Sequence, residues 1–350
     1  MFTRVNIMTF NISPPDGAND ASIQAHLDSR LKPPGALGVL EATAASLVRI
    51  LGPSTHAIRS PVMLLFAGDH GVSAEGVSIV APSTTHLMVH HFLEGNASIN
   101  SFCRQADLAL KVIDCGTLQA HAPHPQLVDH RLGEMTAPFH REPAMTLEQL
   151  ETGFENSRRL IGELHADGCN LIALGEMGIG NTTSASALMA ALTHLPFDVC
   201  IGAGSGVTPT IMKRKQDIVQ LGLQRHSQAL QDTRTTLAAL GGFEIVSMVG
   251  AILAAAEKGM VVLVDGFITT VAALCACRMA PEARGYLIFS HCGDERGHRP
   301  LLEQLDAVPL LHMGLRLGEG SGAALALPLL RSALAFYYEM ASLEEAGLVL

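Results

Sequence analysis

Short apolar runs alternate with longer amphipathic stretches over most of the chain. The runs contain little polar alternation, which is the pattern of strands buried on both faces of a parallel sheet. Since the stretches between them have the length and spacing of helices, the chain predicts an α/β fold: a parallel sheet with helices on both faces. The predicted strands are PVMLLFA (61–67), LALKVID (108–114), NLIALG (170–175), MVVLVDG (260–266) and YLIFS (286–290), and the predicted helices lie near 83–106, 146–166, 183–193, 211–240, 243–257 and 268–279.

The two ends of the chain are helical in pattern but contain no strand signal. Residues 21–51 predict two helices around a break, because the sequence LKPPG at 31–35 cannot be helical throughout. A long helix is expected from Gly322 onward. Residues 116–145 combine prolines, glycines and histidines without periodicity, and we expect them to form a loop.

Composition narrows the class of protein. The chain has 350 residues, enough for about two domains. Its net charge of −10 argues against a nucleic-acid or anionic-membrane surface, which requires a basic excess. It has no tryptophan and three tyrosines, so an aromatic platform for base stacking is not expected either.

The cysteines and the N-terminus indicate the cellular compartment. The seven cysteines (103, 115, 169, 200, 275, 277 and 292) include no CxxC pair and are odd in number, which favours reduced thiols over a disulfide framework. The N-terminus lacks the features of a signal peptide, and no run reaches the ~18 apolar residues that span a bilayer. We therefore expect a cytoplasmic protein that is not inserted in a membrane.

Polar residues and glycines follow four of the predicted strands directly. The strand ends are marked by Asp69 and His70, by Glu176, by Asp265 with Gly266, and by Ser290 with His291. Because ligands of open parallel sheets bind beyond the carboxyl ends of the strands, these residues predict one site at that edge. Each end alone could be an ordinary turn.

The richest of these ends is GEMGIGNTT at 175–183. It follows a strand and opens a helix, so its backbone N–H groups can form a phosphate cradle. It is neither a Walker A loop nor a GxGxxG fingerprint, which disfavours a nicotinamide-dependent dehydrogenase. A tight strand-to-helix turn is the plain alternative.

Two further glycine clusters belong to the candidate site. Gly202–Gly206 precedes Lys213–Lys215, and a lysine beside a phosphate cradle is a reasonable counter-charge. Glu319 lies between Gly318 and Gly320, and the small neighbours leave its carboxylate open to a ligand, as a general base requires. The alternative for Glu319 is an acid that favours the start of a helix through the dipole.

Other chemistries are poorly supported. His86 and His90 are four residues apart, but no HExxH and no cysteine or carboxylate lies at ligand spacing, so we expect no metal. A serine hydrolase is disfavoured because no GxSxG occurs. Met88 and Met177 fall within the candidate site, where methionine can line an aromatic pocket.

Several motifs, taken in order along the chain, resemble one family. They are KPPGALGVLE (32–41), FAGDHGVSAEGVS (66–78), GEMGIGNTTSASAL (175–188), VDGF (264–267), SHxxxExGH (290–298) and LRLGEGSGAALALPL (315–329). They resemble the nicotinate-nucleotide:dimethylbenzimidazole phosphoribosyltransferases over nearly the whole chain. The resemblance implies a Rossmann-like large domain of residues 59–322 and a small helical domain formed by 1–58 and 323–350.

The resemblance also implies an activity. Members of the family are dimers that transfer the 5-phosphoribosyl group of nicotinate mononucleotide to an aromatic base such as 5,6-dimethylbenzimidazole. The products are nicotinate and an α-ribotide, used for the nucleotide loop of cobamides such as vitamin B12, and no cofactor is implied. Glu319 matches the general base that takes the benzimidazole proton, and Glu176 matches a second carboxylate near the ribose. Gly178, Lys215 and Gly266 match positions that hold the phosphate.

The chain departs from the family pattern at several positions. Gly293 stands where a serine commonly touches the phosphate, and Val80 and Met88 replace more polar residues of the acceptor pocket. The alternatives are a subunit of a heteromeric phenol- or p-cresol-activating phosphoribosyltransferase, heterodimeric with a paralogue, and a non-catalytic nucleotide-binding subunit. The expected catalytic residues are Glu319 and Glu176, and the expected substrate-binding residues are Met177, Gly178, Ile179, Gly180, Asn181, Lys215, Asp265, Gly266, Ser290, Gly293, Val80, Met88, Asp69, His70, Leu317, Gly318 and Gly320.

Overall fold

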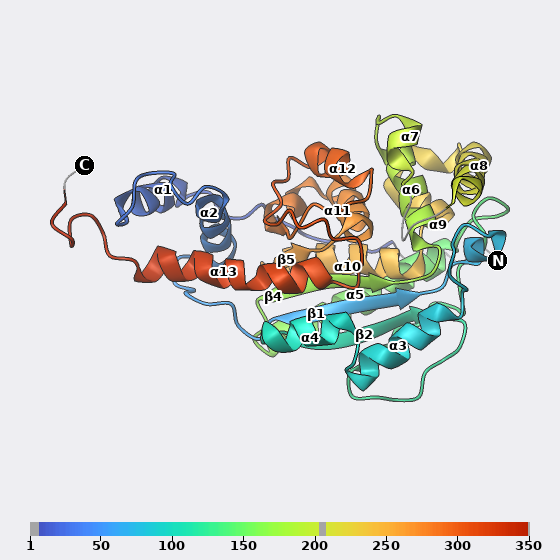
Figure 1. Ribbon diagram of the computed structural model, residues 1–350, viewed down its shortest axis with the longest axis horizontal. Coiled ribbons are helices and arrows are strands. Elements are labelled where there is room, and N and C mark those ends of the chain that lie inside the picture. Colours follow the sequence, from blue (N-terminus) through green and yellow to red (C-terminus); the bar gives the residue numbers. More distant parts are fainter. Residues whose placement is uncertain (1–6, 203–207, 349–350) are drawn as a thin grey trace.

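The computed structural model describes residues 7–202 and 208–348. Its described part contains one six-stranded sheet with the order β3-β2-β1-β4-β5-β6, and every pair is parallel (Figure 1). The order reverses between β1 and β4, which is the switch point where ligands of such sheets bind. The strands are β1 (Val62–Gly68), β2 (Ala109–Gly116), β3 (Leu127–Asp129), β4 (Leu171–Met177), β5 (Val261–Val264) and β6 (Leu287–Phe289).

The five predicted strands are present, and the prediction for residues 116–145 was wrong in one respect. Within this segment, Leu127–Asp129 form β3 and pair with Val112–Asp114 of β2. β3 is an edge strand of three residues and is largely half-buried, so it lacks the apolar run by which β6, an edge strand of the same length but fully buried, is recognised.

The predicted helices are also present, with two divisions. The stretch 83–106 is split by Gly95, which adopts a left-handed conformation with φ 77°. The stretch 211–240 is interrupted after Arg225, and the helix that follows is capped by the side chain of Asp232. The helices are α1 (Asp20–Ser29), α2 (Val39–Leu51), α3 (Thr84–Glu94), α4 (Ser98–Gln105), α5 (Leu147–Ala166), α6 (Asn181–Leu192), α7 (Phe197–Cys200), α8 (Pro209–Arg225), α9 (Thr233–Leu240), α10 (Phe243–Glu257), α11 (Phe267–Met279), α12 (His298–Gln304) and α13 (Ser321–Glu339), with short 3₁₀ turns at Gly71–Glu75, Ala229–Gln231 and Pro281–Tyr286.

Helices cover both faces of the sheet, as the apolar runs predicted. Alternate residues of β1 enter different cores: Leu64 and Phe66 pack on the side of α10 and α11, and Met63 and Leu65 pack on the side of α4 and α13. These four side chains have no exposed surface. Burial on both faces explains why the strands lack polar alternation.

Helices α1 and α2 pack with α13 at one end of the molecule, while the first residues that the structure describes lie at the other end (Figure 1). The residues before α1 contact the large body of the protein: Met8 N–H donates to Glu151 of α5, and Asn11 N–H donates to Glu257 of α10.

The first turns of α13 pack on β4 and β5, and its last turns extend to α1 and α2. His26 Nε2 lies 2.7 Å from the Tyr337 carbonyl oxygen, and Arg30 donates a hydrogen bond to the Met340 carbonyl at 2.6 Å. The division into a small and a large domain stays a prediction. Of the helices described, none is long and apolar enough to cross a membrane.

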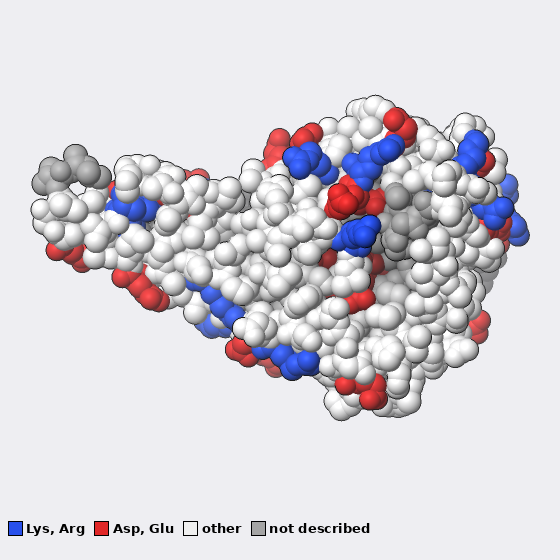
Figure 2. Space-filling view, in the orientation of Figure 1, with Lys and Arg blue, Asp and Glu red and all other residues white. Residues whose placement is uncertain are grey.

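The seven cysteines are free thiols, as the sequence predicted, and six of them are buried. Figure 2 shows one face of the molecule, where acidic and basic side chains lie in small mixed groups on a largely uncharged surface.

Candidate active site

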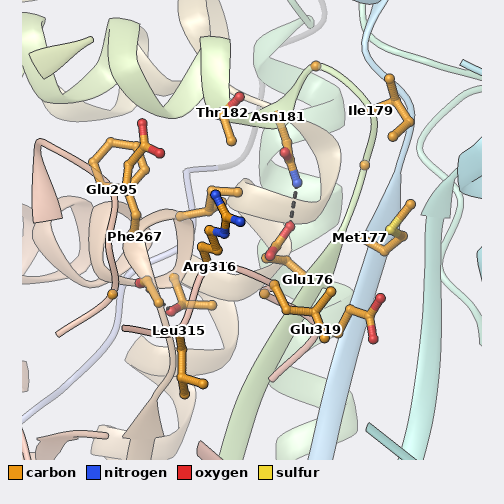
Figure 3. A pocket seen from close by; sticks show the side chains of 18 of the residues that line it. Glu176, Met177, Ile179, Asn181, Thr182, Phe267, Glu295, Leu315, Arg316 and Glu319 are labelled. Carbon is orange, nitrogen blue, oxygen red and sulfur yellow. Dashed lines mark hydrogen bonds between the residues drawn. The ribbon is translucent and has the colours of Figure 1, made fainter. Parts of the chain in front are cut away.

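A pocket of about 340 Å³ lies at the carboxyl edge of the sheet, beside the switch point between β1 and β4 (Figure 3). One wall is formed by residues 176–182, which connect β4 to α6, and another by residues 266–269 at the start of α11. The segment 315–319 before α13 closes one side, and apolar residues of 77–88 close another.

Thirteen of the residues predicted for the site line this pocket. Six others do not, because neighbouring elements cover them. The lining residues are Glu319, Glu176, Met177, Gly178, Ile179, Gly180, Asn181, Gly266, Gly293, Val80, Met88, Leu317 and Gly318, and those behind the wall are Lys215, Asp265, Ser290, Asp69, His70 and Gly320. Of the predicted cluster Gly202–Gly206, positions 203–206 lie outside the described residues.

Glu176 comes from the end of β4 and is buried, with 8% of its surface exposed. The amide of Asn181, in the first turn of α6, donates a hydrogen bond to its carboxylate. Burial raises the pKa of Glu176 to about 8, and the negative charges of Asp265 and Glu244 add to this shift. Glu176 is therefore protonated in most molecules at neutral pH when the pocket is empty.

Glu319 has a left-handed backbone conformation, with φ 63°, between Gly318 and Gly320, which both have φ 84°. A non-glycine residue rarely adopts this conformation, which costs about 1 kcal/mol or more. The carboxylate is buried, and no described residue hydrogen-bonds its Oε2 atom. Burial, with a contribution from Asp265, raises the pKa of Glu319 to about 7. A carboxyl group that titrates near neutral pH is suited to accept a proton.

The two carboxyl groups lie at the same end of the pocket (Figure 3). Glu176 packs against the backbone of the segment that carries Glu319, since a Cβ atom at Gly318 would lie only 2.5 Å from Glu176 Oε1. The charge of Glu319 further raises the pKa of Glu176.

The carboxylate of Asp265 fixes the backbone directly after Glu319 by hydrogen bonds. Asp265 follows β5 and accepts hydrogen bonds from the backbone N–H groups of Gly320 at 3.2 Å and Ala323 at 2.9 Å. It thereby caps α13, whose own N-cap residue, Gly320, has no side chain. Burial raises the pKa of Asp265, and the nearby imidazole of His291 opposes this shift.

Two helices begin at the pocket wall. Gly180–Thr182 lead into α6 and Gly266–Thr269 lead into α11. The first N–H groups of a helix have no partner within the helix and favour an anion. Lys215 supports the start of α6 from behind, because its Nζ donates to Thr182 Oγ1 at 3.2 Å and to the Gly202 carbonyl at 2.9 Å. Burial lowers the pKa of Lys215 to about 8.

We predicted that Asp69 and His70 would line the pocket, but they do not. They lie beneath the end of β4, which carries Glu176, and beneath the loop that follows it. His70 Nε2 lies 2.7 Å from Glu244 Oε1, and its Nδ1 lies 3.0 Å from Ser184 Oγ. A Cβ atom at Gly178 would overlap the Gly68 carbonyl, so β1 packs tightly under this loop. The end of a central strand is thus covered, and its polar groups support the loop.

Several lining residues were not among the predicted site residues. Arg316 lines the pocket, and its guanidinium is directed into it (Figure 3). Signals were present in the sequence: Arg316 directly precedes LGEGSG, and the motif SHxxxExGH at 290–298 contains five pocket residues. The additional lining residues are Val77, Ser78, Thr84, Thr182, Phe267, Ile268, Thr269, His291, Asp294, Glu295, His298, Leu315 and Arg316.

The histidines considered as metal ligands lie elsewhere. His86 of α3 stacks on His121, with ring centroids 4.3 Å apart. Among the residues that the structure describes, no group of three histidine, cysteine, aspartate or glutamate side chains is placed to hold a metal ion.

The strand order and the pocket together define a ligand-binding α/β protein that combines proton-accepting carboxyl groups with helix N-termini suited to an anion. Residues 12–348 match the family DBI_PRT, Phosphoribosyltransferase, and the chain belongs to this family. The motifs had indicated this family, and the match confirms it.

Named relatives agree along almost the whole chain. The nicotinate-nucleotide–dimethylbenzimidazole phosphoribosyltransferase of Shewanella oneidensis is 52% identical over 341 residues, covering 97% of each chain. That of Shewanella loihica is 54% identical over 329 residues, covering 94% of this chain and 96% of its own. The crystal structure of CobT from Thermus thermophilus superposes with a TM-score of 0.90 at 40% identity, covering 94% of this chain and 98% of that one.

Proposed function

We propose that this chain transfers the 5-phosphoribosyl group of nicotinate mononucleotide to 5,6-dimethylbenzimidazole or a similar aromatic base, which releases nicotinate and gives the α-ribotide used for cobamide assembly. The observation that carries the proposal is Glu319: a buried carboxyl group, held in a strained conformation between two glycines, with a pKa raised to about 7. The names of the relatives give the substrates.

Glu319 acts as the general base. A benzimidazole is neutral and weakly nucleophilic, and removal of its ring N–H proton makes the ring a much better nucleophile. The carboxylate of Glu319 takes this proton while a ring nitrogen forms a bond to the anomeric carbon. The bond from that carbon to the pyridinium nitrogen breaks, and its electron pair leaves with nicotinate. A single displacement on the β-linked donor gives the α-linked product.

Glu176 balances the positive charge of the donor. The anomeric carbon resembles an oxocarbenium ion in the transition state, as in glycoside chemistry. The pyridinium ring of the donor is already cationic, so its binding beside Glu176 lowers the pKa of this carboxyl group and favours its ionised form. Asn181 fixes the carboxylate by its hydrogen bond.

The pocket offers different surroundings to the two substrates. The starts of α6 and α11 suit the phosphate of the donor, with Lys215 behind them. Arg316 supplies a positive charge inside the pocket for this doubly anionic donor. The aromatic base fits the apolar wall of Val77, Val80, Met88 and Met177, where neither tryptophan nor tyrosine is present.

We also propose that the enzyme works in the cytoplasm as a homodimer. Free thiols suit a reducing compartment. Exposed apolar side chains support association: Leu31, Leu37 and Val39 belong to the helical end of the molecule, and Ile79 and Leu317 lie near the pocket. We further propose that residues 1–58 and 323–350 form a small domain, to which α1, α2 and most of α13 belong, beside a large domain of 59–322.

Release of nicotinate tests the proposed activity. Purified protein is incubated with nicotinate mononucleotide and 5,6-dimethylbenzimidazole, and both nicotinate and the ribotide are quantified by chromatography. The variant Glu319→Gln keeps the size of the side chain and removes the base, so we expect it to lose about 10²-fold or more in rate. Absence of product with this base and with a panel of phenols would contradict the proposal.

A further inference from the structure

Two histidines of the pocket wall, His291 and His298, differ in whether both of their ring nitrogens have hydrogen-bond partners. Their rings meet edge to face, with centroids 5.8 Å apart. Both lie in the segment after β6, and both are buried, with 4% and 0% of their surfaces exposed. Neither has a role in the transfer described above.

Both ring nitrogens of His298 have hydrogen-bond partners within the protein. The backbone N–H of Gly293 donates to its Nδ1 atom at 2.9 Å, so Nδ1 carries no proton. The proton of the neutral ring is therefore on Nε2, which lies 3.1 Å from Thr270 Oγ1. Burial lowers the pKa of His298 to about 3. Both nitrogens are thus used, and the ring is neutral.

His291 is anchored at one end only. Its Nδ1 lies 2.9 Å from Ser290 Oγ and 3.8 Å from a carboxylate oxygen of Asp265. Its backbone neighbours are fixed as well, since Leu311 N–H donates to the Ser290 carbonyl and Cys292 N–H donates to the Leu311 carbonyl. The hydrogen bonds of the described residues leave Nε2, which faces the pocket, without a partner.

Nε2 of His291 lies between two glycines of the pocket wall. A Cβ atom at Gly293 would lie 3.3 Å from Nε2, and one at Gly266 would lie 3.8 Å from it. A side chain at either position would cover this nitrogen, so the two glycines leave it accessible. Gly266 also starts α11, whose first N–H groups favour an anion at the same place.

We propose that His291 is a binding residue for the phosphate of the donor: its Nε2–H donates to a phosphate oxygen at the start of α11, while its Nδ1 accepts a hydrogen bond from the hydroxyl of Ser290. This inference rests on the proposed function, because it takes nicotinate mononucleotide as the donor. Lys215, which is 1% exposed and already bonded to Thr182 and Gly202, supports the phosphate from behind the wall.

Two substitutions of His291 distinguish the role of its Nδ1 atom from that of its Nε2 atom. His291→Asn retains a polar group near the position of Nδ1 and removes the far donor, and His291→Gln places an amide near the position of Nε2. The surface variant His312→Asn is the matched control, since His312 is exposed and does not line the pocket. The folding of each variant is compared by its thermal unfolding midpoint.

The readout compares a donor with and without phosphate. For nicotinate mononucleotide we expect His291→Asn to raise KM about 10- to 100-fold, as for a lost hydrogen bond to a charged group, with kcat changed by less than about threefold. His291→Gln should recover part of this loss. For nicotinate riboside, which lacks the phosphate, kcat/KM should be unchanged. An equal loss for both donors, or no loss for either, would overturn the proposal.

Binding of inorganic phosphate tests the same inference without turnover. We expect calorimetry to show that the wild-type protein and His312→Asn bind phosphate, and that His291→Asn binds it at least about tenfold more weakly. Equal binding by all three proteins would reject the role of His291 even if the transferase activity is present. An absence of turnover together with weakened phosphate binding in His291→Asn would reject the proposed reaction and keep this site.

Discussion

The carboxylate of Asp265, at the end of β5, accepts a hydrogen bond of 2.9 Å from the backbone N–H of Ala323, in the first turn of α13. A second hydrogen bond, from Gly320 N–H at 3.2 Å, makes Asp265 the cap of the N-terminus of this helix. The sheet is thereby tied to the segment that carries Glu319, and the same negative charge raises the pKa of Glu319 and of Glu176. Asp265 is thus placed to set both the position and the proton affinity of the two carboxyl groups.

Asp265→Asn should therefore change two properties at once. We expect kcat to fall about 10- to 100-fold, because the amide cannot accept both bonds as a carboxylate does. The acid limb of kcat/KM should also move to lower pH, because a negative charge beside Glu319 is lost. Rate measurements across the pH range check both effects. Asp167→Asn, at an exposed position, is the control. If the acid limb of the Asp265→Asn profile stays at the wild-type pH, Asp265 has only a structural role.

Activity should depend on pH through Glu319. Its pKa of about 7 means that the base is protonated, and inactive, below that pH. We expect kcat, measured at saturating nicotinate mononucleotide so that Glu176 is ionised, to fall about tenfold for each pH unit below about pH 6.5 and to level off at higher pH, where the Glu319 carboxylate is ionised. A rate profile from about pH 5 to about pH 9, at constant ionic strength, gives the measurement. A profile that is flat through neutral pH would exclude Glu319 as the base.

Glu176→Gln should stabilise the fold at alkaline pH. The pKa of Glu176 rises from its ordinary value of 4.5 to about 8 on folding, so the folded state prefers the protonated form. The free energy of unfolding that Glu176 contributes is thus greatest below about pH 4.5 and is lost as the pH rises through about 8. The amide of the glutamine stays neutral at every pH, and its oxygen can still accept from Asn181.

The expected result is a melting temperature that exceeds the wild-type value by a few degrees at about pH 8.5 and matches it more closely at about pH 5. Activity should be strongly reduced at both. Glu163→Gln, an exposed position on α5, should show no such difference between the two pH values. The same melting difference at both pH values would show that burial does not shift the pKa of Glu176.

Gly318→Ala should disturb Glu176 through a direct clash. Gly318 and Gly314 both have left-handed backbones, with φ 84° and 65°, so alanine is strained at either position by about 1 kcal/mol. They differ in their surroundings: a Cβ atom at Gly318 lies 2.5 Å from Glu176 Oε1, and one at Gly314 has no neighbour within 4 Å. The comparison of the two variants therefore isolates the contact.

We expect Gly318→Ala to lower kcat at least about tenfold and Gly314→Ala to leave it within about twofold, while both lower the melting temperature by similar amounts. Steady-state kinetics and thermal unfolding are measured on both proteins. Equal kinetics in the two variants would show that the position of Glu176 is not set by this contact.

Met88→Gln should weaken the binding of an apolar acceptor. Met88 lies half-buried on α3 and lines the apolar wall with Val77 and Val80. A glutamine there loses dispersion contacts and must be desolvated when 5,6-dimethylbenzimidazole binds. We expect KM for this base to rise about 5- to 50-fold, with KM for nicotinate mononucleotide unchanged. Leu87→Gln, at an exposed neighbouring position, is the control. A change in the KM of the donor would place Met88 elsewhere in the site.

The sequence by itself determined the fold class, the five strands that form apolar runs, and the family. These features depend on local properties: an apolar run buried on both faces needs no knowledge of its neighbours to be recognised as a strand. The glycines beside Glu319 likewise indicated an unusual backbone through their residue type alone, and they flank a left-handed residue. The three-residue strand β3 was missed because its pairing with β2 is what defines it.

Only the tertiary structure decided which polar residues line the pocket. Asp69, His70 and Asp265 all follow strands, as Glu176 terminates one, yet the first three are covered by neighbouring helices and loops. His291 follows a strand and lines the pocket, as its position in the sequence predicted, but Arg316 reaches the pocket only because segments far apart in the chain meet there. Local sequence specifies the end of a strand, but the exposure of a side chain at that end depends on what packs over it.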